Sequence, residues 1–224
     1  MEILIHFFGR NGMNDTLVRL IGWTATVLYA ELCVFDRWRW LKRHLLRGHL
    51  RTLDAGCGSG LFTMYASRMG NEAVGIDLDE YHCQLAQQRA SILRMCNVQF
   101  IQADLRDLDK FAGKLGDVFD QIICLETIEH VKNDTKLVTS LSGLLKPHGR
   151  LYLTTPFRNC RPLFGDKLSE YEDGGHVRWG YTHDEVRELF GQCGLDVLEE
   201  QYISGFVSHR LTDLMMVLTR ITFQ

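Results

Sequence analysis

Short apolar runs that alternate with segments of helical spacing are the main pattern of this chain. Apolar runs within residues 50–55, 73–77, 98–103, 119–125 and 150–155 have the length of buried strands. Between them, residues 60–69, 79–96 and 133–145 carry apolar side chains three and four positions apart, which predicts helices. Alternating strands and helices predict a doubly wound α/β fold, with a mostly parallel sheet covered by helices on both faces.

The second half of the chain is less regular. Residues 157–179 show no clear period, and Thr182 with Glu185 then forms a capping box for a helix that ends before Gly194. Residues 195–203 predict a sixth strand and residues 205–217 an apolar helix. Residues 218–223 provide a short seventh strand, unless the chain is truncated there. The expected sheet therefore has six or seven strands.

The N-terminal segment, residues 1–48, predicts a helical lid on a main domain of residues 49–224. Asn14 or Asp15 caps a helix whose apolar run, residues 20–30, is too short to cross a bilayer. Residues 37–43 then combine basic side chains with Trp38 and Trp40. A lid helix with a solvated basic face is favoured, because most amphipathic helices pack against their own protein. The alternative is a helix that makes peripheral contact with a membrane surface.

Composition narrows the function classes. A chain of 224 residues usually forms one globular unit, here a monomer or a homodimer. A net charge of −3 argues against nucleic acid as the partner. The seven cysteines show no CxxC or zinc-finger spacing, which predicts reduced thiols and a cytoplasmic location, with membrane-peripheral contact as the variant.

A glycine-rich turn follows the first predicted strand, from Leu53 to Gly60, in the pattern Asp-x-Gly-x-Gly-x-Gly. Glycines between a strand and a helix let a ligand approach the backbone. Asp54 would repel a pyrophosphate but suits a cationic amino group, which disfavours a dinucleotide. Asp77 follows at the spacing at which a carboxylate accepts ribose hydroxyls, and Asp104 ends the third strand.

These residues, together with residues 146–153, resemble the ordered motifs of class I S-adenosylmethionine-dependent methyltransferases (methyltransferase type 11/12 group) over residues 50–203. The resemblance implies a Rossmann-like fold, and the family's usual seven strands exceed the six clear ones here. It also implies S-adenosylmethionine as cofactor, with S-adenosylhomocysteine as the product. The cofactor-binding residues implied are Asp54, Gly56, Cys57, Gly58, Gly60, Asp77, Leu78, Asp104, Leu105 and Leu125.

The motif Glu-x-x-Glu-His stands directly after the fourth strand, at Glu126, Glu129 and His130. On a helix these positions share one face. The pattern resembles that of ubiquinone-pathway O-methyltransferases and of small-RNA 2′-O-methyltransferases, in which it holds a metal. The RNA enzymes add a later histidine, and His176 matches its placement. The implied metal ligands are Glu126, Glu129, His130 and His176, for Mg²⁺, Mn²⁺ or Zn²⁺.

A metal-free site is the favoured alternative, because the same motif occurs in class I methyltransferases without a metal. In that case His130 is the leading general base and His176 the second. Methyl transfer requires mainly alignment of nucleophile, methyl group and sulfonium, and a base only where the acceptor is protonated. Arg178 holds an acidic group of the substrate or forms an ordinary salt bridge.

The acceptor is the least determined part of the prediction. Residues 124–127 lack the Asn/Asp-Pro-Pro-aromatic signature of methyltransferases that act on planar amides. The apolar terminal helices indicate a partly hydrophobic substrate. We therefore expect O-methylation of a small metabolite. Three alternatives stay open: N- or C-methylation of a small metabolite, RNA 2′-O-methylation, and a catalytically silent methyltransferase-like partner subunit.

Overall fold

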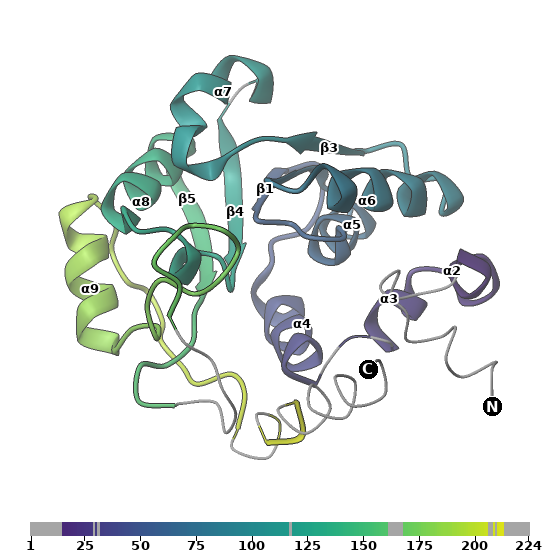
Figure 1. Cartoon of the computed structure of the whole chain (residues 1–224). Coiled ribbons are helices and arrows are strands. Elements are labelled where there is room, and N and C mark those ends of the chain that lie inside the picture. The colour runs from purple at the N-terminus through teal and green to yellow at the C-terminus, as the bar shows by residue number, and fades with distance from the viewer. Residues whose placement is uncertain are drawn as a thin grey trace.

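The structure, a computed structural model, describes residues 15–28, 30, 32–116, 118–160, 168–205, 208 and 210–212. Strands and helices alternate through the middle of the chain (Figure 1). The strands are β1 (Arg51–Ala55), β2 (Glu72–Asp77), β3 (Val98–Gln102), β4 (Phe119–Leu125) and β5 (Leu145–Thr154). The helices that follow successive strands are α5 (Leu61–Arg68), α6 (Glu80–Ile92), α7 (Leu108–Leu115), α8 (Asp134–Gly143) and α9 (His183–Gln192).

The five strands form one parallel sheet in the order β3-β2-β1-β4-β5. The chain moves outward from β1 to β3 and then returns to the other side of β1 to form β4. The strand order therefore reverses between β1 and β4. In open α/β sheets ligands bind outside the carboxyl ends of the strands at such a point. The ends of β1 and β4 are thus the expected edges of a site.

Helices cover both faces of the sheet, as predicted. On one face, α7, α8 and α9 pack their apolar side chains into a cluster that contains Ile122 of β4. On the other face, α4 (Leu32–His44), α5 and α6 pack around the next residue, Ile123. Because successive side chains of a strand point to opposite faces, β4 contributes to both clusters. Both isoleucines are fully buried, which explains the continuous apolar run of this strand.

The predicted count of six or seven strands is wrong for the described residues, which contain five. Residues 195–203 have the alternation of a strand but pair with no neighbour in this part of the chain. Leu198 and Tyr202 are 80% and 65% exposed, so the segment buries only part of its apolar surface, although Leu195 packs against the core. The predicted strand at residues 218–223, and most of the predicted helix at 205–217, lie outside the described residues.

Within residues 15–28, 30 and 32–48, the described part of the N-terminal segment, three helices form rather than one. These are α2 (Asp15–Ile21), α3 (Thr24–Leu28) and α4, and Gly22, with a left-handed φ of 66°, separates the first two. Trp23 is buried, and its indole N–H donates to the carbonyl of Leu61 at 3.3 Å. The segment is thereby packed onto α5. No helix in the described ranges has both the length and the apolar character needed to cross a membrane.

Candidate active site

The glycine-rich loop between β1 and α5 passes close to two neighbouring elements. The amide of Gly56 donates to the carbonyl of Ile76, at the end of β2, at 2.9 Å. Gly56 has a φ of +81°, and a Cβ there would lie 2.4 Å from Oγ1 of Thr127. A Cβ at Gly60, with a φ of +82°, would lie 2.8 Å from the ring of Phe100. Only glycine fits both positions, so the loop presents backbone rather than side chains to the crevice.

Asp77 is fixed beside this loop. The amides of Gly58 and Asp79 donate to its two carboxylate oxygens, at 2.7 and 2.9 Å. This orientation is the one in which a carboxylate at the end of a second strand can accept ribose hydroxyls. Leu78, the next residue, is 53% exposed at the same edge.

Cys57 is a packed residue within the loop. It is buried, and its hydrogen bond with Cys83 of α6, together with burial, raises the pKa of its thiol far above the usual range. A buried thiol with a raised pKa is not a nucleophile. Its size matters instead, because it fills the space over Gly75, where a Cβ would lie 2.9 Å from its sulfur.

Asp104 caps the short helix η1 (Leu105–Asp107) and is already paired. Its carboxylate accepts the backbone amide of Arg106 at 2.9 Å and the guanidinium Nε at 2.8 and 2.9 Å. The hydrogen bond from the Arg106 side chain, aided by its charge, holds the pKa of Asp104 below the usual range. Leu105 and Leu125, the other predicted contacts here, are buried, so they would meet a ligand mainly through their backbone.

Asp54 lies beneath the glycine loop rather than on its surface. It is 2% exposed, and its carboxyl group accepts the hydroxyl of Thr63 at 2.6 Å. Burial raises its pKa to about 7, although the hydrogen bonds from Thr63 oppose the shift. A cationic group brought close to Asp54 would stabilise its ionised form, and the contact with an amino group stays a prediction.

The raised pKa of Asp54 predicts a pH-dependent stability. Between pH 4 and pH 7 the folded state keeps a proton on Asp54 that the unfolded chain releases, so the stabilising contribution is lost as the pH rises. Replacement by asparagine removes this dependence and keeps an acceptor for Thr63. We expect Asp54→Asn to gain stability relative to wild type as the pH rises, by up to about 1.4 kcal/mol per pH unit.

Urea unfolding of both proteins, without ligand, at four pH values between 4.5 and 8 measures this difference. Asp120→Asn is the matched control, because an ion-pairing hydrogen bond to Lys146 lowers the pKa of that carboxylate. Its difference from wild type should stay constant over this range. A constant difference for Asp54→Asn would contradict the prediction.

Glu126 does not join the predicted group. Its φ of +50° is left-handed, and the chain continues into the short 3₁₀ helix η2 (Ile128–His130) instead of an α-helix. The carboxylate therefore turns away, where it accepts the hydroxyl of Thr154 at 2.9 Å and pairs with Arg37 of α4 at 3.2 Å. The shared helical face expected for Glu126, Glu129 and His130 does not form, and the predicted ligand set loses its first member.

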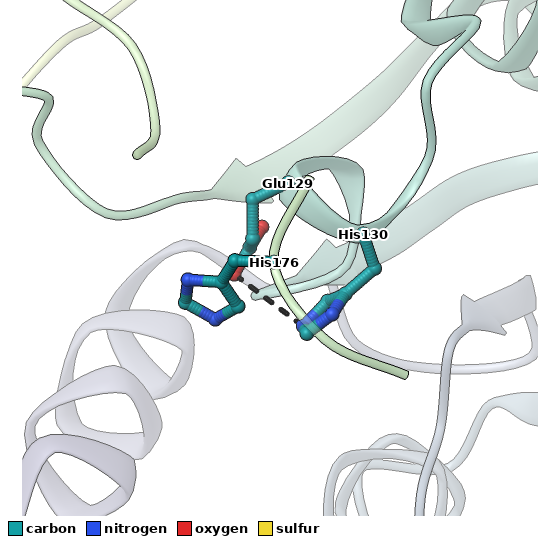
Figure 2. A group of neighbouring side chains, drawn as sticks. All are labelled: Glu129, His130 and His176. Atoms are coloured by element: carbon teal, nitrogen blue, oxygen red, sulfur yellow. Dashed lines mark ion pairs between the residues drawn. The ribbon is translucent and has the colours of Figure 1, made fainter. Parts of the chain in front are cut away.

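Glu129, His130 and His176 do come together, although His176 lies far along the chain (Figure 2). One ligand atom from each lies within 4.8 Å of the other two. Nε2 of His130 is 4.0 Å from a carboxylate oxygen of Glu129, and the two imidazole rings meet edge to face at 4.7 Å between centroids. We call these three residues the histidine group.

The hydrogen bond of His130 indicates which of its ring nitrogens can ligate a metal or accept a proton. Nδ1 lies 3.1 Å from the carbonyl oxygen of Gly175, and a carbonyl only accepts, so Nδ1 carries the hydrogen in the neutral ring. The lone pair is then on Nε2, which faces Glu129. This is the arrangement of a histidine that ligates a metal or accepts a proton through Nε2.

Glu129 is fully buried. Burial, followed by the nearby charge of Glu126, raises its pKa to about 8, so the carboxyl group is largely protonated at neutral pH without a ligand. Its Oε1 has no hydrogen-bond partner among the described residues. An orphaned oxygen beside two imidazoles fits a divalent cation that accepts mixed nitrogen and oxygen ligands. In a metal-free site the carboxyl proton stays on Glu129, because 4.0 Å separates its Oε1 from Nε2 of His130.

The loop that carries His176 is fastened to η2 by several bonds. The amide of Val177 donates to the carbonyl of Glu129 at 2.9 Å, and the amide of Ser169 donates to that of His176 at 2.7 Å. Arg178 pairs with Asp134 and donates to the carbonyls of residues 131 and 132, both at 2.7 Å. Of the two roles predicted for Arg178, a contact with the substrate or a salt bridge, the structure shows the salt bridge.

A cavity of about 1060 Å³ opens between β5, α4, α9 and residues 194–204. Its walls are largely aromatic and aliphatic, with Trp40, Tyr152 and Phe157 among them. Arg37 and Glu126 lie in its wall, and Glu126 precedes Glu129 of the histidine group by three residues. Helix α4 thus lines a cavity, and its role as a lid over a substrate pocket stays a prediction. The sequence interpretation missed Arg37, because only its ion pair with Glu126 distinguishes it from the neighbouring basic residues.

Comparison with known proteins agrees with this geometry. Residues 53–153 match a family described as a methyltransferase domain. The ubiquinone biosynthesis O-methyltransferase of Acinetobacter baylyi is 29% identical over 138 residues, which cover 60% of this chain and 56% of that protein. Several further relatives carry the same name. The chain spans about half the length of these curated relatives.

Solved structures share the fold. The YcgJ protein from Bacillus subtilis has a TM-score of 0.60 at 20% identity, with 84% of this chain and 81% of that chain covered. The [4+2]-cyclase SpnF has a TM-score of 0.66 at 20% identity, with 83% and 66% covered. A cyclase on the same fold illustrates that the fold alone does not define the reaction, and the site must do so.

Proposed function

We propose that this chain, which carries a class I S-adenosylmethionine-dependent methyltransferase domain, transfers a methyl group to a hydroxyl oxygen of a partly hydrophobic small molecule. The proposal rests on the histidine group. Two of its members follow β4, at the edge of the sheet where the glycine loop and Asp77 also lie. The cavity along β5 supports an acceptor with an apolar part. The relatives named as O-methyltransferases support an oxygen acceptor.

In this proposal the cofactor lies along the carboxyl edge of the sheet. Adenine approaches Asp104, the ribose hydroxyls bind Asp77, and the methionine amino group stabilises the ionised form of Asp54. The loop backbone from Gly56 to Gly60 follows the cofactor closely. The methyl group then points toward the histidine group, and transfer proceeds by in-line displacement at the methyl carbon.

His130 is the proposed general base. A hydroxyl is a weak nucleophile until it loses its proton, and Nε2 of His130 is the lone pair positioned to accept that proton. The carbonyl of Gly175 stabilises the resulting imidazolium by accepting from Nδ1. His176, partly exposed like His130, orients the acceptor or serves as a second base.

A divalent metal is the second form of the same site. Glu129, His130 and His176 would hold it, and the orphaned Oε1 of Glu129 is the observation that favours it. A bound metal of this kind lowers the pKa of a coordinated hydroxyl. In that form Glu129 binds as the carboxylate, which reverses the protonation expected of the metal-free protein.

Calorimetric titration with S-adenosylmethionine and S-adenosylhomocysteine, with EDTA and then with Mn²⁺ or Mg²⁺, tests the proposal. We expect micromolar binding of both nucleosides, and heat from the metal only if the histidine group holds it. Transfer from labelled S-adenosylmethionine to catechol-type and to monohydroxyl acceptors then tests the oxygen acceptor. A folded protein that binds neither nucleoside would refute the proposal. Binding with no transfer to any acceptor would support a catalytically silent partner subunit.

A cytoplasmic location is part of the proposal. All seven cysteines lie in the described part of the chain, and all are free thiols. Free thiols in this number are typical of a reducing compartment.

A further inference from the structure

We propose that Arg106 and Glu172 couple the adenine end of the cofactor site to the histidine group. The inference rests on the proposed function, since it takes Asp104 as the adenine contact. It assigns to both residues a positioning role and no contact with the reacting atoms.

The first observation is that Arg106 engages both carboxylate oxygens of Asp104. The guanidinium donates from Nε and from Nη2, at 2.5 Å for Nη2, while the backbone amide of Arg106 donates at 2.9 Å. Three N–H groups of Arg106 thus approach the two carboxylate oxygens, which offer about four lone-pair sites. An adenine amino group that donates to Asp104 therefore competes with the guanidinium for these oxygens.

The second observation is that Arg106 already has another anionic partner. Its Nη1 lies 3.5 Å from Oε2 of Glu172, a residue of the loop that carries His176. Because the cation stands between two carboxylates, it can leave Asp104 without losing its charge partner. A guanidinium released from one carboxylate strengthens its bonds to the other.

The third observation is where Glu172 is anchored. Its Oε1 accepts the backbone amide of Lys132 at 2.7 Å, and Lys132 Nζ donates to the carbonyl of Glu170 at 2.6 Å. Lys132 follows His130 by two residues. Glu172 therefore contacts the cofactor side through Arg106 and the exit of η2 through Lys132.

These contacts define the coupling. Adenine takes one oxygen of Asp104, Arg106 turns toward Glu172, and the stronger pair fastens residues 169–178 against η2. The amide bonds from Val177 to Glu129 and from Ser169 to His176 are part of the same loop. Cofactor binding thus holds His176 beside His130 before the acceptor enters. By reciprocity, loosening the loop weakens cofactor binding.

The coupling is tested by measuring the affinities of two ligands, S-adenosylhomocysteine and its purine analogue that lacks the 6-amino group. Each affinity is measured for the wild type, Arg106→Met and Glu172→Gln. Arg106→Met frees Asp104, so we expect about fivefold tighter binding of the amino ligand and unchanged binding of the analogue. Glu172→Gln removes the second partner of Arg106, so the amino ligand should bind about threefold more weakly, again without change for the analogue. Lys110→Met, which removes an exposed cation paired with Asp107, is the matched control and should change neither affinity.

Amide hydrogen exchange provides the second readout. In wild type, saturating S-adenosylhomocysteine should slow exchange at Ser169 and Val177 by about tenfold, and both variants should lose this effect. Equal weakening of both ligands by Arg106→Met would overturn the coupling and indicate that Arg106 contacts the cofactor or only supports the fold. If the wild type binds neither ligand, the proposed function itself fails. If the wild type binds both and the variants leave the ratio of the two ligand affinities unchanged, only the coupling is refuted.

Discussion

Replacing His130 by alanine is expected to lower the rate of methyl transfer by a factor of about 10² to 10⁴, with the affinity for S-adenosylhomocysteine unchanged. The side chain supplies the Nε2 lone pair of the histidine group and is not among the residues proposed to bind the cofactor. Removing a group that acts only on the proton lowers kcat and leaves cofactor binding intact. Single-turnover transfer and calorimetric binding, measured on the same preparation, separate the two effects.

Glu129→Gln distinguishes the two forms of the site. In the metal-free form the buried carboxyl group is largely protonated at neutral pH, so glutamine replaces it with little change in shape or charge. Activity should then fall by less than about tenfold. In the metal form the variant loses an anionic ligand, and both metal binding and transfer should collapse. His49→Asn serves as the control, because His49 is exposed and has a left-handed φ of 37°, which asparagine tolerates. Full activity of His130→Ala would exclude His130 as base and as ligand.

Gly56→Ala is expected to abolish detectable cofactor binding and to lower the free energy of unfolding by roughly 2 to 4 kcal/mol. The new methyl group would lie 2.4 Å from Oγ1 of Thr127, at a φ of +81° that alanine disfavours. Thr127 cannot move away freely, because its hydroxyl donates to the carbonyl of Ala55 at 3.3 Å or of Leu125 at 3.0 Å. The loop must shift, and with it the Gly58 amide that donates to Asp77.

Gly113→Ala is the matched control for this substitution. Gly113 lies in α7, and a Cβ there would contact nothing within 4 Å. We expect that variant to bind normally and to be as stable as wild type or up to about 1 kcal/mol more stable. Thr127→Ala added to Gly56→Ala removes the two nearest atoms and should restore part of the stability. Wild-type affinity in Gly56→Ala would show that the loop does not need glycine at this position.

The apolar pattern predicted the middle of the fold well because each buried run there has a neighbouring strand. β1, β2, β3 and β4 all appear where the runs occur, and Thr182 with Glu185 forms the predicted capping box. Residues 195–203 have a similar alternation, yet Leu198 is exposed and no strand pairs with it in the described part of the chain. Alternation reports a capacity to form a strand, whereas a strand also requires a partner with free backbone groups.

The site was harder to predict, because two of its determinants are not local in sequence. Nothing in the identity of Glu126 indicates its left-handed backbone, which turns its carboxylate toward Arg37 instead of the histidine group. The pairing of Arg106 with Asp104 could have been suspected from a spacing of two residues, but the reach of Arg106 to Glu172 depends on how a distant loop folds. Asp77 illustrates the opposite case, since its position directly after a strand was enough to place it.

The position of His176 on a late loop has a consequence for synthesis. Strands β1 to β4, the glycine loop and Asp104 are complete when Glu126 has been added, and about fifty residues still separate Glu126 from His176. At about 5 to 20 residues per second, a nascent chain spends roughly 3 to 10 seconds with the nucleoside-binding half made and the histidine group unfinished. The chain can therefore bind the nucleoside before it can accept the proton of the acceptor. The loop that contains Glu172 and His176 is the last part needed for the two steps together.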